Sequence, residues 1–295
     1  MLNPAVAIDR INAAFGGSLG HRVLHAKGRF YSGTFTATAE ASALCRAAHL
    51  QGDPVPVLVR WSNGGGNPRV KDQAPDVRGM AVSFRPEGGA TDLLGQTSPR
   101  FPVRTPEDFV ALTEAAINVK RMPLFLARHP AAVGALAVNL RAKGLAMPHS
   151  FAEATFYPIH AYGWLDEAGN RTWVRYRFVP HARKAERLET TYGGRDRLAE
   201  EIAARLARGP VWHDVRVTVA GPGDDPHDPM SVWKGEREFR AGTIEVTEEI
   251  ADPEADGDVV VFDPTRVVDG IELSDDPILR YRPDAYSVSV SRRSG

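Results

Sequence analysis

The sequence of 295 residues contains a single cysteine, Cys45. One cysteine cannot form a disulfide within the chain, and it cannot supply the clustered thiolates of a structural zinc or iron–sulfur site. The chain also has no apolar run that approaches the roughly 18 residues expected of a membrane-spanning helix. Residues 1–10 lack the basic start and long apolar core of a secretory signal peptide. We therefore expect a soluble, cytoplasmic protein.

An excess of charge of either sign is also missing. The chain carries 36 Lys and Arg residues against 37 Asp and Glu residues, a formal net charge of -1, and its pI is about 6.8. A chain with this balance has no general attraction to nucleic acid or to an anionic membrane surface, so we expect neither as a partner. The glycine run at 64–66 lacks the Lys-Ser/Thr pair of a phosphate-binding loop, and no His-Glu-x-x-His zinc motif occurs.

The hydrophobic patterns that are present predict strands closed by a few helices. Runs rich in β-branched and aromatic residues predict strands at 56–62, 79–84, 92–95, 173–179, 211–219 and 243–246. Apolar residues at helical spacing predict helices at 107–119, 123–143 and 195–208. The acidic segment 248–258 predicts a solvated connection. No internal repeat or long linker is present, which favours a single domain over residues 1–295, of the α+β class and built on an antiparallel sheet or barrel.

The last segment predicts a helix that breaks a local rule. Residues 274–277 read Ser-Asp-Asp-Pro, which combines an N-cap serine, acidic residues and a proline, and predicts a helix that begins near Asp275. Pro283 should kink or end that helix at about Arg282. If the helix continues, Arg282 and Tyr286 lie one turn apart on the same face.

Two residues near opposite ends of the chain have complementary chemistry. His25 lies between apolar neighbours in the segment 22–28, and such a histidine can accept and return a proton. Tyr286 follows Arg282 by four positions, and a guanidinium favours the phenolate, an anionic ligand for ferric iron. Taken alone, a histidine such as His25 is more often an ordinary surface or core residue, and a tyrosine near a C-terminus usually just packs. Together they suggest a haem between the two segments, with peroxide chemistry on the histidine side.

Several separate segments resemble haem catalases. In chain order they are 22–28 (RVLHAKG), 60–62 (RWS), 76–81 (DVRGMA), 92–99 (DLLGQTSP), 262–265 (FDPT), 270–271 (GI) and 282–286 (RPDAY, an Arg-x-x-x-Tyr pattern). The resemblance extends over nearly the whole chain and is strongest to small catalase-related peroxidases, a branch without the C-terminal helical domain of full-length catalases. It implies a catalase-like antiparallel β-barrel with surrounding helices, a short N-terminal arm at residues 1–20, and haem b as the cofactor.

The resemblance implies a role for residues on each face of the haem. Tyr286 would be the proximal iron ligand, and Arg282 would donate to its oxygen. Asp276 and His160 would fix the position of that arginine. On the distal face His25 would be the catalytic acid and base, oriented by Ser62 and accompanied by Gln96. The remaining cofactor-binding positions are the propionate-binding Arg22, Arg60 and Arg293, and the apolar Leu24, Phe101, Phe109 and Phe262.

Departures from the family pattern favour peroxidase activity over catalase activity. Gln96 stands where catalases have an asparagine, and its extra methylene moves the amide by about one ångström, a displacement to which catalysis is sensitive. Pro102 and Met80 replace phenylalanines. With the shorter arm and the missing C-terminal domain, these features favour reduction of hydrogen peroxide or organic hydroperoxides by an organic electron donor, with weak or no catalase activity.

Three other functions remain open. A true minimal catalase would dismutate hydrogen peroxide without a donor. A fatty-acid hydroperoxide isomerase is disfavoured by Leu24, because such proteins tend to have threonine before the distal histidine. A haem carrier or sensor is disfavoured by His25, since a carrier needs no distal acid and base. Catalase relatives are oligomeric, and we expect a homodimer for a chain of this length. No signature for a nicotinamide cofactor is readable.

Overall fold

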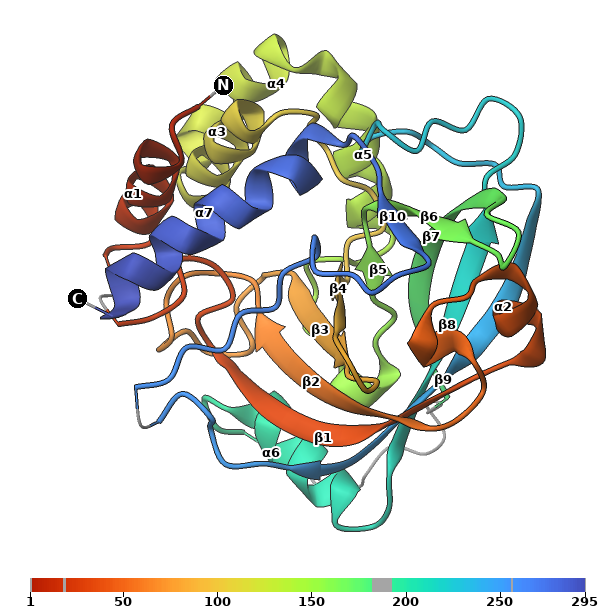
Figure 1. The fold of residues 1–295 in the computed structure, drawn as a ribbon. Coiled ribbons are helices and arrows are strands. Elements are labelled where there is room, and N and C mark those ends of the chain that lie inside the picture. Colours follow the sequence, from red (N-terminus) through yellow and green to blue (C-terminus); the bar gives the residue numbers. More distant parts are fainter. Residues whose placement is uncertain (1, 18–19, 182–192, 256, 295) are drawn as a thin grey trace.

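The structure, a computed structural model, describes residues 2–17, 20–181, 193–255 and 257–294. Within these residues the chain forms a 10-stranded sheet with the order β10-β6-β7-β8-β9-β1-β2-β3-β4-β5 (Figure 1). The strands are β1 (Gly28–Ala37), β2 (Val55–Asn63), β3 (Arg78–Phe84), β4 (Thr91–Gln96), β5 (Tyr157–Pro158), β6 (Ala161–Leu165), β7 (Arg171–Pro180), β8 (Val211–Val219), β9 (Arg237–Glu249) and β10 (Ile271–Leu273). All neighbouring strands pair antiparallel.

The sheet curls back on itself. A β-bridge joins Phe156, just before β5, to Phe178 in β7, so the edge of the sheet that β5 forms meets β7. Register shifts in the pairing of β9 with β1 and with β8 allow a locally stronger bend. The predicted α+β class and the antiparallel barrel are therefore confirmed. That the whole chain is one domain stays a prediction.

The interior of the curled sheet is a large hydrophobic core. Strand β8 shows the expected period of two, because Val211, Val215 and Val217 are buried while their neighbours are more exposed. The largest fully buried aromatic side chains in this core are Tyr31, Phe35, Trp61, Phe84, Phe156, Tyr162, Trp164 and Phe178. Trp61 on β2 stacks against Phe151 with ring centroids 6.0 Å apart. The strands that lead to the candidate site are thus held in place by the closely packed core inside the curled sheet.

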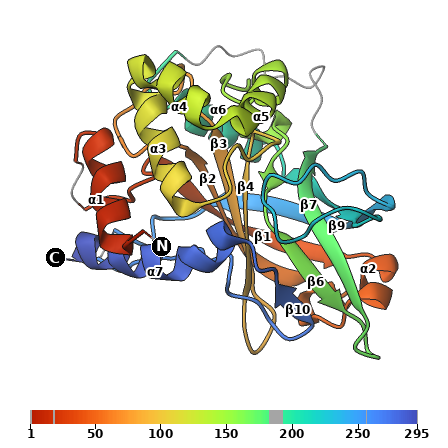
Figure 2. The same cartoon turned by 90° about the horizontal axis from the view of Figure 1, so that it is seen from above.

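The helices of the described residues are α1 (Pro4–Ala14), α2 (Ala39–Leu44), α3 (Pro106–Ile117), α4 (Met122–Arg128), α5 (Pro130–Arg141), α6 (Arg197–Leu206) and α7 (Pro277–Ser294). Of these, α1, α3, α4, α5 and α7 gather on one side of the sheet, while α2 and α6 lie apart from them and contact β9 (Figure 1). Figures 1 and 2 show α1, α3 and α7 side by side, and these three helices pack against one another. The first and last helices of the described chain are therefore neighbours. Among the helices of the described ranges, none is long and apolar enough to cross a bilayer.

Several of the predicted elements are present, and one is wrong. The strand predicted at 243–246 extends over all of β9, and the helices predicted at 107–119 and 195–208 correspond to α3 and α6. The single helix predicted over 123–143 is instead two, α4 and α5. His129 between them has a non-helical conformation, with φ -126° and ψ 64°. Pro130 explains the break, since proline disfavours helical backbone at the preceding residue and readily starts a new helix.

Helix α7 passes through its internal proline, although it does not start as the sequence suggested. The predicted cap, Ser274, is not the capping residue. Asp276 caps the helix instead, because its Oδ1 accepts hydrogen bonds from the backbone N–H groups of Ile278 (2.8 Å) and Leu279 (3.4 Å). The helix then continues past Pro283 to Ser294. The side chains that follow the proline consequently keep helical spacing with those that precede it.

Candidate functional site

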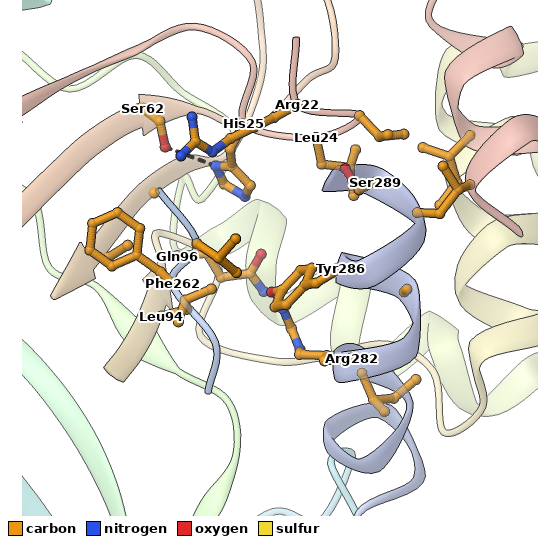
Figure 3. Close-up of a pocket in the computed structure, with 18 of the residues that line it drawn as sticks. Arg22, Leu24, His25, Ser62, Leu94, Gln96, Phe262, Arg282, Tyr286 and Ser289 are labelled. Atoms are coloured by element: carbon orange, nitrogen blue, oxygen red, sulfur yellow. Dashed lines mark hydrogen bonds between the residues drawn. The ribbon is translucent and has the colours of Figure 1, made fainter. Parts of the chain in front are cut away.

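A deep cavity lies between the sheet and the helical cluster. Its walls come from β2, β3 and β4, from α1, α3 and α7, and from the loops that carry His25 and Phe262 (Figure 3). It contains about 1490 Å³ of empty space, including the part that opens to solvent. All predicted catalytic and cofactor-binding residues line it, namely Arg22, Leu24, His25, Arg60, Ser62, Gln96, Phe101, Phe109, Phe262, Arg282, Tyr286 and Arg293. Residues from both ends of the chain thus meet in one cavity.

His25 is held in position by its backbone and by its ring. Its φ of 54° lies in the left-handed region, and its N–H donates to the carbonyl of Gly64 at 2.9 Å. The ring Nδ1 lies 2.9 Å from Oγ of Ser62 on β2, which leaves Nε2 for a ligand in the cavity. Burial, followed by the positive charges of Arg60, Arg282 and Arg22, lowers the pKa of His25 to about 3. The imidazole is therefore neutral at ordinary pH.

Gly79 on β3 is a site residue that the sequence did not identify individually. A Cβ at this position would lie 2.6 Å from Nδ1 of His25 and 2.7 Å from Oγ of Ser62. Any other residue would push against the imidazole or the hydroxyl that orients it. Gly79 belongs to the segment 76–81 that resembles haem catalases. The reason for a glycine there is its close approach to His25 and Ser62, which only the pairing of β2 with β3 reveals.

Tyr286 and Arg282 form the opposite wall, on α7. Nη1 of Arg282 donates a 2.8 Å hydrogen bond to Oη of Tyr286. Burial acts to lower the pKa of Arg282, but the charge and hydrogen bond of Tyr286 outweigh it and raise that pKa. The phenol oxygen therefore lies beside a permanent cation within the cavity wall. Figure 3 shows the side chains of His25, Gln96 and Tyr286 directed into the same space.

Asp276 and His160 lie behind this wall and do not line the cavity. Nδ1 of His160 is 2.6 Å from Oδ2 of Asp276, and both side chains are buried. Burial lowers the pKa of His160. The pKa of Asp276 is also lowered, because hydrogen bonds from His160 and from the backbone N–H groups of Ile278 and Leu279 outweigh burial. The pair is thus a carboxylate that accepts from a neutral imidazole. In the described part of the chain neither residue bonds directly to Arg282, and the charge of Asp276 helps to raise the pKa of Arg282.

Three guanidinium groups meet at another part of the cavity. Nη1 of Arg60 donates to the carbonyl of His25 at 2.9 Å, while Arg22 and Arg293 both form ion pairs with Glu254. The Nε groups of Arg60 and Arg293 are buried and have no hydrogen-bond partner within the described ranges. Burial and the charge of Arg22 lower the pKa of Arg60 to about 9. Such a cluster is suited to carboxylate ligands.

The ion pairs of Glu254 correct the interpretation of the acidic segment 248–258. Its first two residues belong to β9, and the side chain of Glu254 is only 17% exposed. The segment is therefore in part structural, and not merely a solvated connection. Charge composition alone did not show this, because the partners lie far away in the sequence.

The remaining walls are apolar. The rings of Phe101 and Phe109 stack with centroids 5.7 Å apart, and Phe262 stacks on Phe30. Ile8 and Ile11 of α1 complete the lining, which the sequence did not predict for the N-terminal arm. The site as a whole combines apolar walls, one phenol–guanidinium pair, one neutral imidazole and a cationic cluster.

Comparisons with known proteins agree with this arrangement. Residues 2–295 match the family model described as Catalase. The chain is 44% identical over 301 residues to a catalase-related peroxidase of Mycolicibacterium paratuberculosis, covering 100% of this chain and 96% of that protein. It is 28% identical over 308 residues to a catalase-related peroxidase of Synechococcus elongatus, covering 99% of this chain and 89% of that protein.

Solved structures show the same fold in larger proteins. Catalase A from Saccharomyces cerevisiae superposes with a TM-score of 0.79 at 20% identity, covering 98% of this chain and 64% of that one. A bacterial catalase superposes with a TM-score of 0.76 at 22% identity, covering 100% of this chain and 62% of that one. The chain thus spans slightly less than two thirds of these catalases and retains their curled sheet and helices. With a family match over residues 2–295 and the same fold around its cavity, the chain belongs to the catalase family.

Proposed function

We propose that the protein is a haem-dependent peroxidase that reduces hydrogen peroxide, organic hydroperoxides or both, at the expense of an organic electron donor. The observation that carries this proposal is the cavity into which His25 and Tyr286 both project from opposite walls. Support also comes from two relatives named catalase-related peroxidases, which this chain matches over almost their full length. A cytoplasmic location and a homodimer remain predictions.

The residues present fit haem b. The phenol oxygen of Tyr286, paired with Arg282, is a suitable axial ligand for ferric iron. The unpartnered Nε groups of Arg60 and Arg293 are donors suited to the propionates, and phenylalanine rings supply apolar walls for the macrocycle. When bound, the haem would supply from its iron and its macrocycle the two electrons that cleavage of the peroxide O–O bond requires.

His25 moves the proton in this proposal. Nε2 is the free nitrogen, because Nδ1 is engaged by Ser62. The neutral imidazole can take the proton from the peroxide, and its low pKa makes the resulting imidazolium a ready donor to the departing oxygen. Ser62 and Gly79 hold the ring in one orientation through this transfer. Asp276 and His160 would stabilise the opposite wall by holding negative charge near Arg282.

Gln96 would decide how the reaction is completed. Its amide projects into the cavity from the end of β4 and can donate a hydrogen bond to a bound peroxide. The longer, more mobile side chain should hold a second hydrogen peroxide less well than an asparagine would, which favours an organic donor as the reductant.

A steady-state comparison tests the proposal. Oxygen release and donor oxidation are measured with hydrogen peroxide and with an organic hydroperoxide, for the wild type and for Gln96→Asn. We expect donor oxidation to exceed oxygen release in the wild type, and Gln96→Asn to shift the ratio toward oxygen release. Rapid oxygen release by the wild type without any donor, far above that of Gln96→Asn, would instead identify a minimal catalase.

A further inference from the structure

Glu254 is a carboxylate at the edge of the cavity that the proposed reaction does not use. Its Oε2 accepts from Nη1 of Arg22, and its Oε1 lies 3.1 Å from Nη1 of Arg293. Oε1 also accepts a 3.0 Å hydrogen bond from the backbone N–H of Val260. One side chain therefore joins two arginines, from the N-terminal and C-terminal parts of the chain, to the loop that precedes Phe262.

These contacts leave much of the arginine cluster available. Glu254 engages one amino group of Arg22 and one of Arg293, while Nη2 of Arg22 donates to the carbonyl of Val260 at 2.6 Å. The buried Nε groups of Arg293 and Arg60 have no partner among the described residues. Glu254 thus contacts the arginines while some of their N–H donors remain free of protein partners. This is expected of a residue that positions the arginines, and not of one that competes with a ligand for them.

Electrostatics point in the same direction. Three like charges around one cavity repel each other, and after burial the charge of Arg22 is the next cause that lowers the pKa of Arg60 and of Arg293. The charge of Glu254 acts in the opposite sense on both. Asp252 also acts on Arg60, but it is exposed and its Oδ1 accepts from the backbone N–H of Glu254. Glu254 is the carboxylate in direct contact with the cluster.

We propose that Glu254 is a positioning residue for the propionates of haem b. It holds Arg22 and Arg293 in place and cancels one of the three positive charges of the cluster, which leaves two for the two propionates. This inference rests on the proposed haem site. It predicts that removing Glu254 weakens haem binding. If Glu254 instead competed with the propionates for the arginines, its removal would strengthen haem binding.

The rate of haem loss from the holoprotein tests this inference without reference to activity. Haem transfer to excess apomyoglobin is followed by absorbance for the wild type, Glu254→Ala and Glu254→Gln. Loss of one charged hydrogen-bonded contact on each of two arginines should speed haem loss by about tenfold or more in Glu254→Ala. Glu254→Gln, which keeps the shape of the side chain, should lie between the two. Asp258→Asn is the matched control, since it makes the same charge change at an exposed position of the same loop, and it should behave as the wild type.

A second arm separates positioning of propionates from general support of the pocket. The proteins are reconstituted with the dimethyl ester of haem b, which has no free carboxylates. The difference between Glu254→Ala and the wild type should then disappear. The inference is overturned if Glu254→Ala loses haem b at or below the wild-type rate, or if the difference persists with the ester. A wild type that binds no haem contradicts the proposed function itself, which is a separate outcome.

Discussion

Arg282 and Tyr286 are joined by a 2.8 Å hydrogen bond along α7, although Pro283 stands between them in the helix. Proline removes an N–H from the helical ladder and its ring crowds the preceding turn. The helix nevertheless continues, so that residues four positions apart remain on one face. Local geometry is thus sufficient to place a guanidinium on the phenol, and the packing of α7 against α1 and α3 supports the helix around the proline.

Replacing Tyr286 by Phe removes the proposed iron ligand with little change in shape. We expect the variant to purify with much less haem, or with a changed absorption spectrum of the ferric protein, because the phenolate no longer donates to the iron. Tyr281→Phe is the matched control on the same helix, since Oη of Tyr281 is buried without a hydrogen-bond partner in the described ranges. An unchanged spectrum in Tyr286→Phe would exclude Tyr286 as the ligand.

Replacing His25 by Ala removes the proposed proton carrier. The rate of reaction with peroxide, measured by rapid mixing, should fall by about 10²- to 10⁴-fold, while haem content is retained. His21→Ala, at an exposed position four residues earlier, should react at the wild-type rate. If His25→Ala reacted as fast as the wild type, the proton would have to move by another route.

Gly79→Ala tests whether the orientation of the imidazole matters. The new methyl group would meet Nδ1 of His25 at 2.6 Å and must displace the ring from Ser62. We expect the rate of reaction with peroxide to fall by about tenfold to a hundredfold, because catalysis responds strongly to a displacement near one ångström. Gly134→Ala in α5 is the control, as a Cβ there meets no atom within 4 Å. Equal rates for Gly79→Ala and the wild type would show that the ring tolerates the displacement.

The stability of the protein should fall in mild acid. His49 and His213 are buried, and burial lowers their pKa values to about 3 and about 4. Above pH 6.5, which is near the pKa of a histidine in the unfolded chain, both histidines are neutral in the folded and in the unfolded protein. Their titration then takes nothing from the free energy of unfolding. Below this pH the unfolded chain binds protons that the folded chain does not, so the free energy of unfolding falls by about 1.4 kcal/mol per pH unit for each histidine.

Urea unfolding between pH 7 and pH 5 measures this slope. His49→Phe should reduce the slope by the contribution of one histidine. A phenylalanine suits this position, because His49 packs against the rings of Phe35 and Phe84 and its Nδ1 has no partner among the described residues. His21→Ala, which changes an exposed histidine, should leave the slope unchanged. A slope that His49→Phe does not alter would show that His49 titrates normally in the folded protein.

Local sequence patterns predicted well those features of the structure that depend only on residues close together in the sequence. The alternation in β8, the apolar face of α6 and the one-turn spacing of Arg282 and Tyr286 all follow from strand and helix periods. The same reasoning merged α4 and α5, because their apolar spacing continues across a proline that ends one helix and starts the next. The resemblance to haem catalases, carried by short motifs, implied all the predicted catalytic and cofactor-binding residues, and the structure brings them to one cavity.

The sequence by itself thus determined the class of fold, which follows from local periodicity, and twelve of the residues that line the cavity, which follow from the resemblance to haem catalases. Only the tertiary structure decided that Glu254 would meet Arg22, 232 positions away, and that α1 would form part of the wall. Contacts of this kind depend on how the sheet curls and where the long connections return, and no local pattern encodes them. The packing of α7 against α1 brings the two ends of the chain together, and Arg22 and Arg293 lie beside one carboxylate. Burial of these charges makes their pairing necessary.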